Sequence, residues 1–143
     1  MTPPETLSLS LAAQVMKALG DESRLRIVHL LFEKTEMCVS DLELILDFTQ
    51  TKTSRHLTYL RNAKLAEGRK VDQRTFYRIC PDLMPLLEGL MPYLANDETL
   101  QKDLDTYRIL YATQELAISR IHQQRWESPS GGQAEEQQEK QKP

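Results

Sequence analysis

Apolar residues in the first third of the chain recur at the three- and four-residue spacing of amphipathic helices. The pattern predicts a first helix over residues 5–19 and a second over residues 22–32. Gly20 ends the first helix, and Asp21 offers its carboxylate as the N-cap of the second. Because the second helix is apolar on more than one face, we expect it at the centre of a small core.

A short helix and a basic helix follow, and together they have the organisation of a helix-turn-helix. Residues 38–46 are predicted to form the short helix. After a brief turn, the basic stretch 50–60 reads QTKTSRHLTYL, with Thr49 as its N-cap. Leu57 and Leu60 form its apolar edge, so the basic and hydroxyl-bearing side chains are left for the opposite face.

Alternating residues after the basic helix predict a two-stranded β-hairpin, in the position of the wing of a winged helix. The strands are expected over residues 65–69 and 75–79, joined by a polar loop over residues 71–74. The loop contains no glycine and has Asp72 and Gln73 at its tip. The predicted fold class is therefore mainly α with a two-stranded β-hairpin, a winged helix-turn-helix.

Two more helical segments are predicted beyond the wing. Pro81 starts the first, and Pro92 should kink or break it. A last long helix is expected from Asn96 or Asp97 to about Trp126, with apolar residues spaced alternately by four and three positions. This seam is interpreted as a homodimer contact of the terminal helices, and packing against the first helix is the alternative.

One domain is expected over residues 5–127, with disordered ends over residues 1–4 and 128–143, since the ends lack apolar periodicity. No apolar run is long enough to span a bilayer and no secretory leader is visible, so a cytoplasmic protein without membrane contact is expected. The chain shows no glycine-rich phosphate loop, paired carboxylates or nucleophile–base arrangement. We therefore expect no enzyme activity and no cofactor.

Charge is distributed unevenly along the chain. The 143 residues carry a net charge of −3. Residues 48–80 contain eight Lys or Arg against two acidic residues, a net of +6, so the remainder carries −9. A local basic patch in a mildly acidic protein is typical of a DNA-binding domain. The alternative function, a winged helix used only for protein contact or dimerisation, has no need of this patch.

Four segments, in consistent order and spacing between residues 10 and 80, resemble the ArsR/SmtB family of metal- and effector-responsive repressors. They read ALGDESRLRI (18–27), EMCVSDL (36–42), SRHLTYLRNAKL (54–65) and RTFYRI (74–79). The resemblance implies a homodimeric winged helix-turn-helix repressor. Such a repressor binds a near-palindromic operator in double-stranded DNA and is released by an effector.

The start of the basic helix is the end that enters the major groove in helix-turn-helix proteins. Gln50 and Thr51 lie there and are predicted to read base edges. The resemblance places Ser54 and His56 near DNA as well, with packing at the helix edge as the alternative for His56. Phosphate contacts are predicted for four cations, Lys52, Arg55, Arg61 and Arg74.

The sensing site is less well defined. The arsenic-type box of the family has two thiolates one residue apart, where this chain has Cys38 and Ser40. Serine is a poor ligand for a soft metal ion, and His122 alone does not make a zinc-type site, so no metal site is assigned. A thiol switch between Cys38 and Cys80, each expected at a helix N-terminus, is one alternative. A metal site built on Cys38 with other ligands, and a repressor with an input elsewhere or none, are the others, and the effector is not identified.

Overall fold

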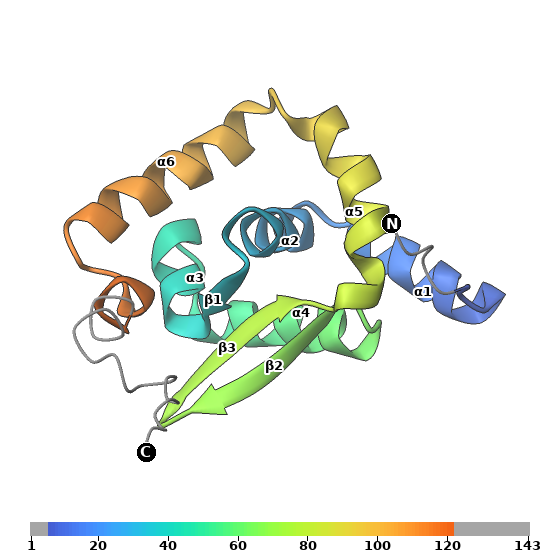
Figure 1. Cartoon of the computed structure of the whole chain (residues 1–143), viewed down its shortest axis with the longest axis horizontal. Coiled ribbons are helices and arrows are strands. Elements are labelled where there is room, and N and C mark those ends of the chain that lie inside the picture. Colours follow the sequence, from blue (N-terminus) through green and yellow to red (C-terminus); the bar gives the residue numbers. More distant parts are fainter. Residues whose placement is uncertain (1–5, 122–143) are drawn as a thin grey trace, which may run out of the picture. The chain divides into compact units, whose positions relative to one another are not determined.

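The computed structural model describes residues 6–121 (Figure 1). The chain divides into two compact units, Met1–Tyr107 and Arg108–Pro143. The first unit contains the helix-turn-helix and the wing. The ends predicted to be disordered, residues 1–4 and 128–143, lie outside the described residues. Within the described part, no helix is both long and apolar enough to cross a membrane.

The first two helices form where the apolar periodicity predicts them. Helix α1 spans Leu9–Leu19 and α2 spans Glu22–Lys34. Gly20 ends α1 and donates its amide back to the last turn of that helix. Asp21 caps α2, because its carboxylate accepts the amide of Arg24 at 3.0 Å. Both predicted caps are thus confirmed.

The helix-turn-helix is formed by α3, Val39–Leu46, and α4, Gln50–Asn62. A short strand, β1, precedes it at Glu36–Cys38. Helix α4 ends where Lys64 takes a left-handed backbone, with φ of 63°. Leu65 then donates its amide to the carbonyl of Leu60 at 3.0 Å, the bond that closes a Schellman cap.

The wing consists of β2, Ala66–Val71, and β3, Arg74–Ile79, paired antiparallel. The sheet has three strands in the order β1-β3-β2, so the two-stranded hairpin predicted from the sequence gains an edge strand. The sequence pattern predicts the start of a helix at Cys38 and does not predict a strand over Glu36–Cys38. Its three residues are too few to show a period of two, and its pairing with β3 is a long-range contact.

The tip of the wing is shorter than predicted. The loop was expected over residues 71–74, but the strands extend to Val71 and Arg74. Asp72 and Gln73 alone make the turn, and Asp72 has a φ of 58°. Asp is among the few residues apart from glycine that accept this backbone region readily, which explains a tight turn without glycine.

Helix α2 lies at the centre of the first unit, as its apolar faces predict. It contacts α1, α4, β1 and β3, and Figure 1 shows it among these elements. Ile27, Leu30 and Leu31 on α2 are each at most 1% exposed. From α4, Leu57 and Leu60 are buried to the same degree. The helix that carries the basic face is thereby anchored to the core along its inner side.

The helical segments between the wing and Ala112 are η1 at Pro81–Leu83, α5 at Met84–Leu90, η2 at Met91–Leu94 and α6 at Glu98–Ala112. The break predicted at Pro92 is confirmed, since α5 ends before it and a 3₁₀ turn takes over. Asp97 caps α6 by accepting the amide of Leu100 at 2.9 Å. Of the two residues predicted for this cap, the structure uses Asp97.

The prediction of one long helix to about Trp126 is wrong, because α6 ends at Ala112. Gln114 takes a left-handed backbone with φ of 61°, and Glu115 donates its amide to the carbonyl of Leu110 at 2.9 Å. This is again the bonding of a Schellman cap. The apolar spacing continues across the turn and therefore does not reveal the stop, while Trp126 itself lies outside the described residues.

Candidate nucleic-acid interface

One stripe of α4 faces the core and leaves the opposite face to solvent. The buried side chains of this stripe are Thr53, His56, Leu57 and Leu60. Their spacing of three, one and three residues follows one side of an α-helix. Because the stripe is continuous, the helix cannot rotate without exposing apolar surface, and the identity of the outward-facing residues is fixed.

The start of α4 is held by Thr49. Its Oγ1 accepts the amide of Lys52 at 3.1 Å, which is the predicted N-cap. The hydroxyl of Thr53 donates to the carbonyl of Thr49 at 2.9 Å. These bonds fix the first turn of α4, on which Gln50 and Thr51 are both exposed. Both predicted base-reading side chains therefore lie at a rigid helix start.

The outward face of α4 is polar and basic. Ser54 and Arg55 are exposed one turn beyond Gln50 and Thr51. Lys52 is half-buried, because its Nζ lies 4.1 Å from the centroid of the Phe48 ring. The remaining predicted cations, Arg61 at the end of α4 and Arg74 at the wing, are also exposed.

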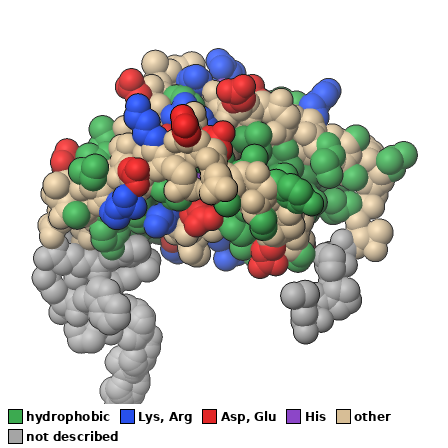
Figure 2. Space-filling model, turned by 90° about the horizontal axis from the view of Figure 1, so that it is seen from above, with side chains coloured by type: hydrophobic (Ala, Val, Ile, Leu, Met, Phe, Trp, Pro, Cys, Tyr) green, Lys and Arg blue, Asp and Glu red, His purple; other side chains and the backbone are tan. Residues whose placement is uncertain are grey.

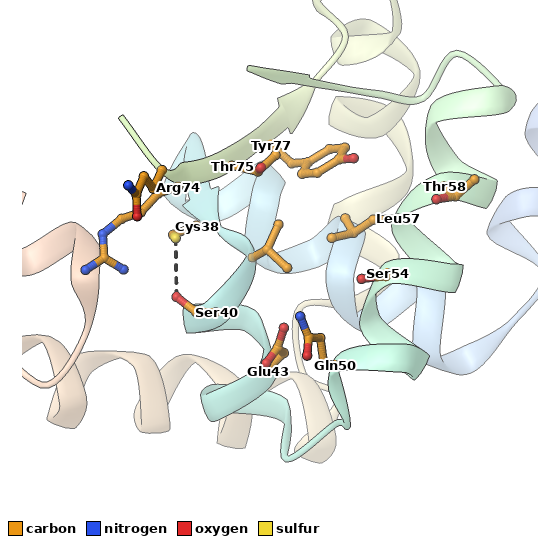
Figure 3. Close-up of a pocket in the computed structure, with 12 residues that line it drawn as sticks. Cys38, Ser40, Glu43, Gln50, Ser54, Leu57, Thr58, Arg74, Thr75 and Tyr77 are labelled. Atoms are coloured by element: carbon orange, nitrogen blue, oxygen red, sulfur yellow. Dashed lines mark hydrogen bonds between the residues drawn. The ribbon is translucent and has the colours of Figure 1, made fainter. Parts of the chain in front are cut away.

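A hollow of about 400 Å³ lies between α4, the start of α3 and the wing (Figure 3). We call it the helix–wing hollow. Gln50, Ser54 and Thr58 border it from successive turns of α4, and Arg74 and Tyr77 border it from β3. Arg74 is thereby placed across the hollow from the helix, on a separate element.

Thr58 is exposed on this face but is absent from the residues predicted from the sequence. It lies one helical turn beyond Ser54, so the spacing of four that links Gln50 to Ser54 would have found it.

His56 is the predicted DNA contact that the structure places inside the domain. Its side chain belongs to the buried stripe and is 6% exposed. Its Nδ1 lies 3.5 Å from Nη1 of Arg24. Burial lowers the pKa of the His56 ring, and the Asp21 carboxylate opposes that shift. The alternative considered for this residue, packing at the helix edge, agrees with these contacts, and we leave His56 out of the proposed DNA surface.

Arg24 holds three helices together beside this histidine. Its Nε donates to the carbonyl of Ala18 at 2.8 Å, at the end of α1. Its guanidinium lies 3.9 Å from the centroid of the Tyr59 ring on α4. An arginine from α2 therefore fixes both the end of α1 and the outer edge of α4.

Two cations of the basic stretch are neutralised on the sheet. Arg69 donates to both carboxylate oxygens of Glu36, at 2.7 and 3.0 Å. Arg78 donates from Nε to Glu67 at 2.6 Å. The partner of Arg69 lies 33 residues away in sequence. The local net charge counted along the sequence therefore overstates the positive charge that this region offers to a polyanion.

The two cysteines lie at helix N-termini, as predicted, but far from each other. Cys38 is the N-cap of α3 and Cys80 the N-cap of η1. Cys38 pairs across the sheet with Phe76, four residues before Cys80. At a rise of about 3.3 Å per residue, the two Cα atoms are separated by about 13 Å along the strand. A disulfide requires roughly 4.4–6.8 Å, so the two thiols of one chain do not bond without a rearrangement of the sheet.

The chemistry of Cys80 also argues against a switch. Burial, with Glu67 adding to the effect, raises the pKa of the Cys80 thiol to about 11. At neutral pH this residue is a thiol, whereas the thiolate is the reactive species. This raised pKa disfavours the thiolate and argues against the alternative of a switch at Cys80. Cys38 is buried, and its Sγ lies 3.4 Å from Oγ of Ser40.

Metal-binding groups do not cluster in the part of the chain that the structure describes: residues 6–121 contain no group of three His, Cys, Asp or Glu side chains arranged to hold an ion. His122, the histidine weighed for a zinc-type site, lies outside this part.

Comparison with known proteins identifies relatives of this chain. A family model described as "Bacterial regulatory protein, arsR family" matches residues 21–67. The arsenic resistance transcriptional regulator ArsR2 of Pseudomonas putida is 36% identical over 113 residues, which cover 73% of this chain and 90% of that protein. The arsenical resistance operon repressor of Escherichia coli is 46% identical over 77 residues, covering 54% of this chain and 66% of that protein.

Solved structures show the same arrangement. HlyU from Vibrio cholerae superimposes with a TM-score of 0.57 at 30% identity, covering 61% of this chain and 95% of that one. The homodimeric winged helix-turn-helix DNA-binding domain of Mb0332 from Mycobacterium bovis gives 0.55, also at 30% identity, covering 64% and 83%. The second of these is described as a winged helix-turn-helix, which is the fold described above, and the chain belongs to the ArsR family of bacterial regulatory proteins.

Proposed function

We propose that the protein is a cytoplasmic, homodimeric transcriptional repressor that binds a specific operator in double-stranded DNA through α4 and the wing. The observation that supports this function most directly is the outward face of α4. Its polar and basic side chains are exposed on a helix whose other side is locked into the core. A rigid helix with exposed residues at its start is what direct readout in the major groove requires.

The side chains divide into two roles. Gln50 and Thr51 lie at the exposed start of α4 and are assigned to base edges, with Ser54 and Thr58 beside them. Phosphate contacts, which position the helix without reading the base sequence, are assigned to four cations. These are the half-buried Lys52 and the exposed Arg55, Arg61 and Arg74. Arg69 and Arg78 are not assigned, because each is paired with a carboxylate.

Dimerisation is supported by apolar surface on α1. Leu9 is 89% exposed and Met16 is 55% exposed, and both lie on α1. Figure 2 shows hydrophobic side chains among those exposed on the face it draws. Apolar side chains clustered on a surface helix are typical of a contact with another chain. The domain of Mb0332 is itself described as homodimeric.

The arsenic input named for several relatives is not assigned to this chain. A soft metal ion selects a pair of thiolates. At the two corresponding positions this chain has Cys38 and Ser40, and the serine hydroxyl does not replace a thiolate for such an ion.

The test uses purified protein and a DNA fragment from upstream of its own gene. Arg55→Ala should weaken binding to operator and to unrelated DNA alike, whereas Gln50→Ala should mainly reduce the preference for the operator. Each variant is compared with the double variant Glu36→Gln/Arg69→Gln, which removes an ion pair at constant net charge and should bind as wild type. Loss of binding in that control, or the reverse pattern in the two single variants, would contradict the assignment.

A further inference from the structure

One cavity that the DNA-binding surface leaves unused lies elsewhere on the first unit. It is open to solvent and has a volume of about 320 Å³ between α2, α5, η2 and the first turns of α6. We call it the α2–α6 cavity. Phe32, Met91 and Leu104 supply apolar walls, and His29, Glu33 and Glu88 supply polar groups. Its volume is at the lower end of the range for small-molecule sites, and the mixture of apolar walls with a few polar groups is typical of them.

His29 is the observation that points to a ligand. The side chain is 3% exposed, and its Nδ1 has no hydrogen-bond partner among the described residues. A buried polar atom without a partner is rare in folded proteins and needs a reason. Burial lowers the pKa of this ring and so favours its neutral form, in which one ring nitrogen accepts a hydrogen bond.

The charge around the cavity selects the kind of donor. Glu33 lies on α2 one turn beyond His29, and Glu88 lies on α5. Neither carboxylate forms an ion pair within the described part of the chain. An ammonium group carries several N–H donors and a positive charge, which suits a neutral imidazole and two carboxylates together. The apolar walls suit a small hydrocarbon group attached to it.

We propose that the α2–α6 cavity binds a small organic amine, whose ammonium group is directed at His29, Glu33 and Glu88 and whose hydrocarbon part packs on Phe32, Met91 and Leu104. This site would be an effector site of the proposed repressor, and its regulatory role rests on that function. The binding of the amine does not rest on that function, because the free protein should bind the amine when no DNA is present.

The position of the cavity connects it to α4. Leu104 adjoins Asp103, whose carboxylate accepts two hydrogen bonds from Arg26 at 2.9 Å. The guanidinium of Arg26 lies 5.3 Å from the centroid of the Phe48 ring. Phe48 immediately precedes Thr49, the N-cap of α4. A ligand that moves α6 against α2 would therefore act on the turn that holds the DNA-reading helix.

Binding is tested with 2-phenylethylamine as the probe, by calorimetry on the free full-length protein at pH 7. The matched probe 2-phenylethanol keeps the hydrocarbon and removes the charge. The amine should bind at least about tenfold more tightly than the alcohol, because it gains charge-assisted hydrogen bonds. Equal binding of the two probes, or no binding of the amine up to millimolar concentrations, would overturn the proposal.

Variants locate the site. The double variant Glu33→Gln/Glu88→Gln changes exposed side chains and should fold, and it should weaken amine binding by at least about tenfold. Glu98→Gln removes one carboxylate on α6 at a position that does not line the cavity, and it should leave amine binding unchanged. His29→Leu should also weaken it if the variant folds. Unchanged affinity in the double variant would place the amine elsewhere and overturn the proposal.

A separate measurement keeps the two hypotheses distinct. With the operator fragment present, bound amine should lower the affinity for DNA at least threefold. If the protein never binds DNA, the proposed repressor function fails while the calorimetry still stands. If DNA binds normally but no amine does, the cavity proposal fails and the repressor function is untouched.

Discussion

His29 and His56 are buried on different helices, and burial lowers the pKa of both rings. In the unfolded chain each ring takes up a proton near pH 6.5. The folded protein takes up these protons only at lower pH. Between the two pKa values the unfolded state therefore binds more protons, and acid shifts the equilibrium toward it.

We predict that the contribution of these two rings to the free energy of unfolding does not change with pH above about pH 7. Below about pH 6.5 the free energy of unfolding should decrease as the pH falls. Urea denaturation between pH 5.5 and 7.5 measures this slope. The double variant His29→Gln/His56→Gln should reduce it. A slope identical to that of wild type would show that other groups cause the dependence.

Arg26 and Asp103 join α2 to α6 across 77 residues of sequence. The Asp103 side chain is 4% exposed, while that of Arg26 is 27% exposed. Removal of one partner leaves a poorly solvated charge without its counterion, which commonly costs about 3 kcal/mol. Replacement of both partners by apolar groups costs much less, because no charge is stranded.

Asp103→Leu should therefore lower the free energy of unfolding by about 3 kcal/mol, whereas Arg26→Met/Asp103→Leu should lower it by clearly less than the losses of Arg26→Met and Asp103→Leu added together. Chemical denaturation of the four proteins gives the coupling energy. Strictly additive losses would mean that the bidentate pair contributes nothing beyond its separate residues.

Elements with strong local signals could be predicted from the sequence. Asp21 and Thr49 cap α2 and α4 because each side chain bonds an amide three residues ahead, which is a purely local interaction. Strand β1 was missed because its three residues depend on β3 for pairing. The end of α6 was missed because the apolar spacing runs on through the turn at Gln114.

The candidate interface shows the same division. Helical periodicity separates Leu57 and Leu60 from the exposed face, so most of the DNA-facing residues could be named in advance. His56 lies four residues before Leu60, so the periodicity allowed packing as well as DNA contact, and only the structure places its side chain in the buried stripe beside Arg24. The pairing of Arg69 with Glu36 could not be seen in the sequence, because the sheet register brings them together.

At the scale of the whole molecule, the proposed dimer depends on α1. Leu9→Lys/Met16→Lys places charge on its exposed apolar side chains and should shift the protein toward monomer in sedimentation analysis. Leu44→Lys is the matched control, because Leu44 is 51% exposed but lies on α3. A wild-type monomer, or equal dissociation in both variants, would contradict a dimer contact through α1.

The central claim is that α4 and the wing bind DNA with unpaired cations. Its most direct test is the dissociation constant for the upstream fragment measured over a range of salt concentrations. We predict a steep linear fall of log affinity with log salt, since each neutralised phosphate releases counterions. In the proposed dimer, Arg55→Ala should reduce the magnitude of the slope by about 1 for each of the two Arg55 side chains that contacts a phosphate. A flat dependence, or a slope unaffected by Arg55→Ala, would contradict the account.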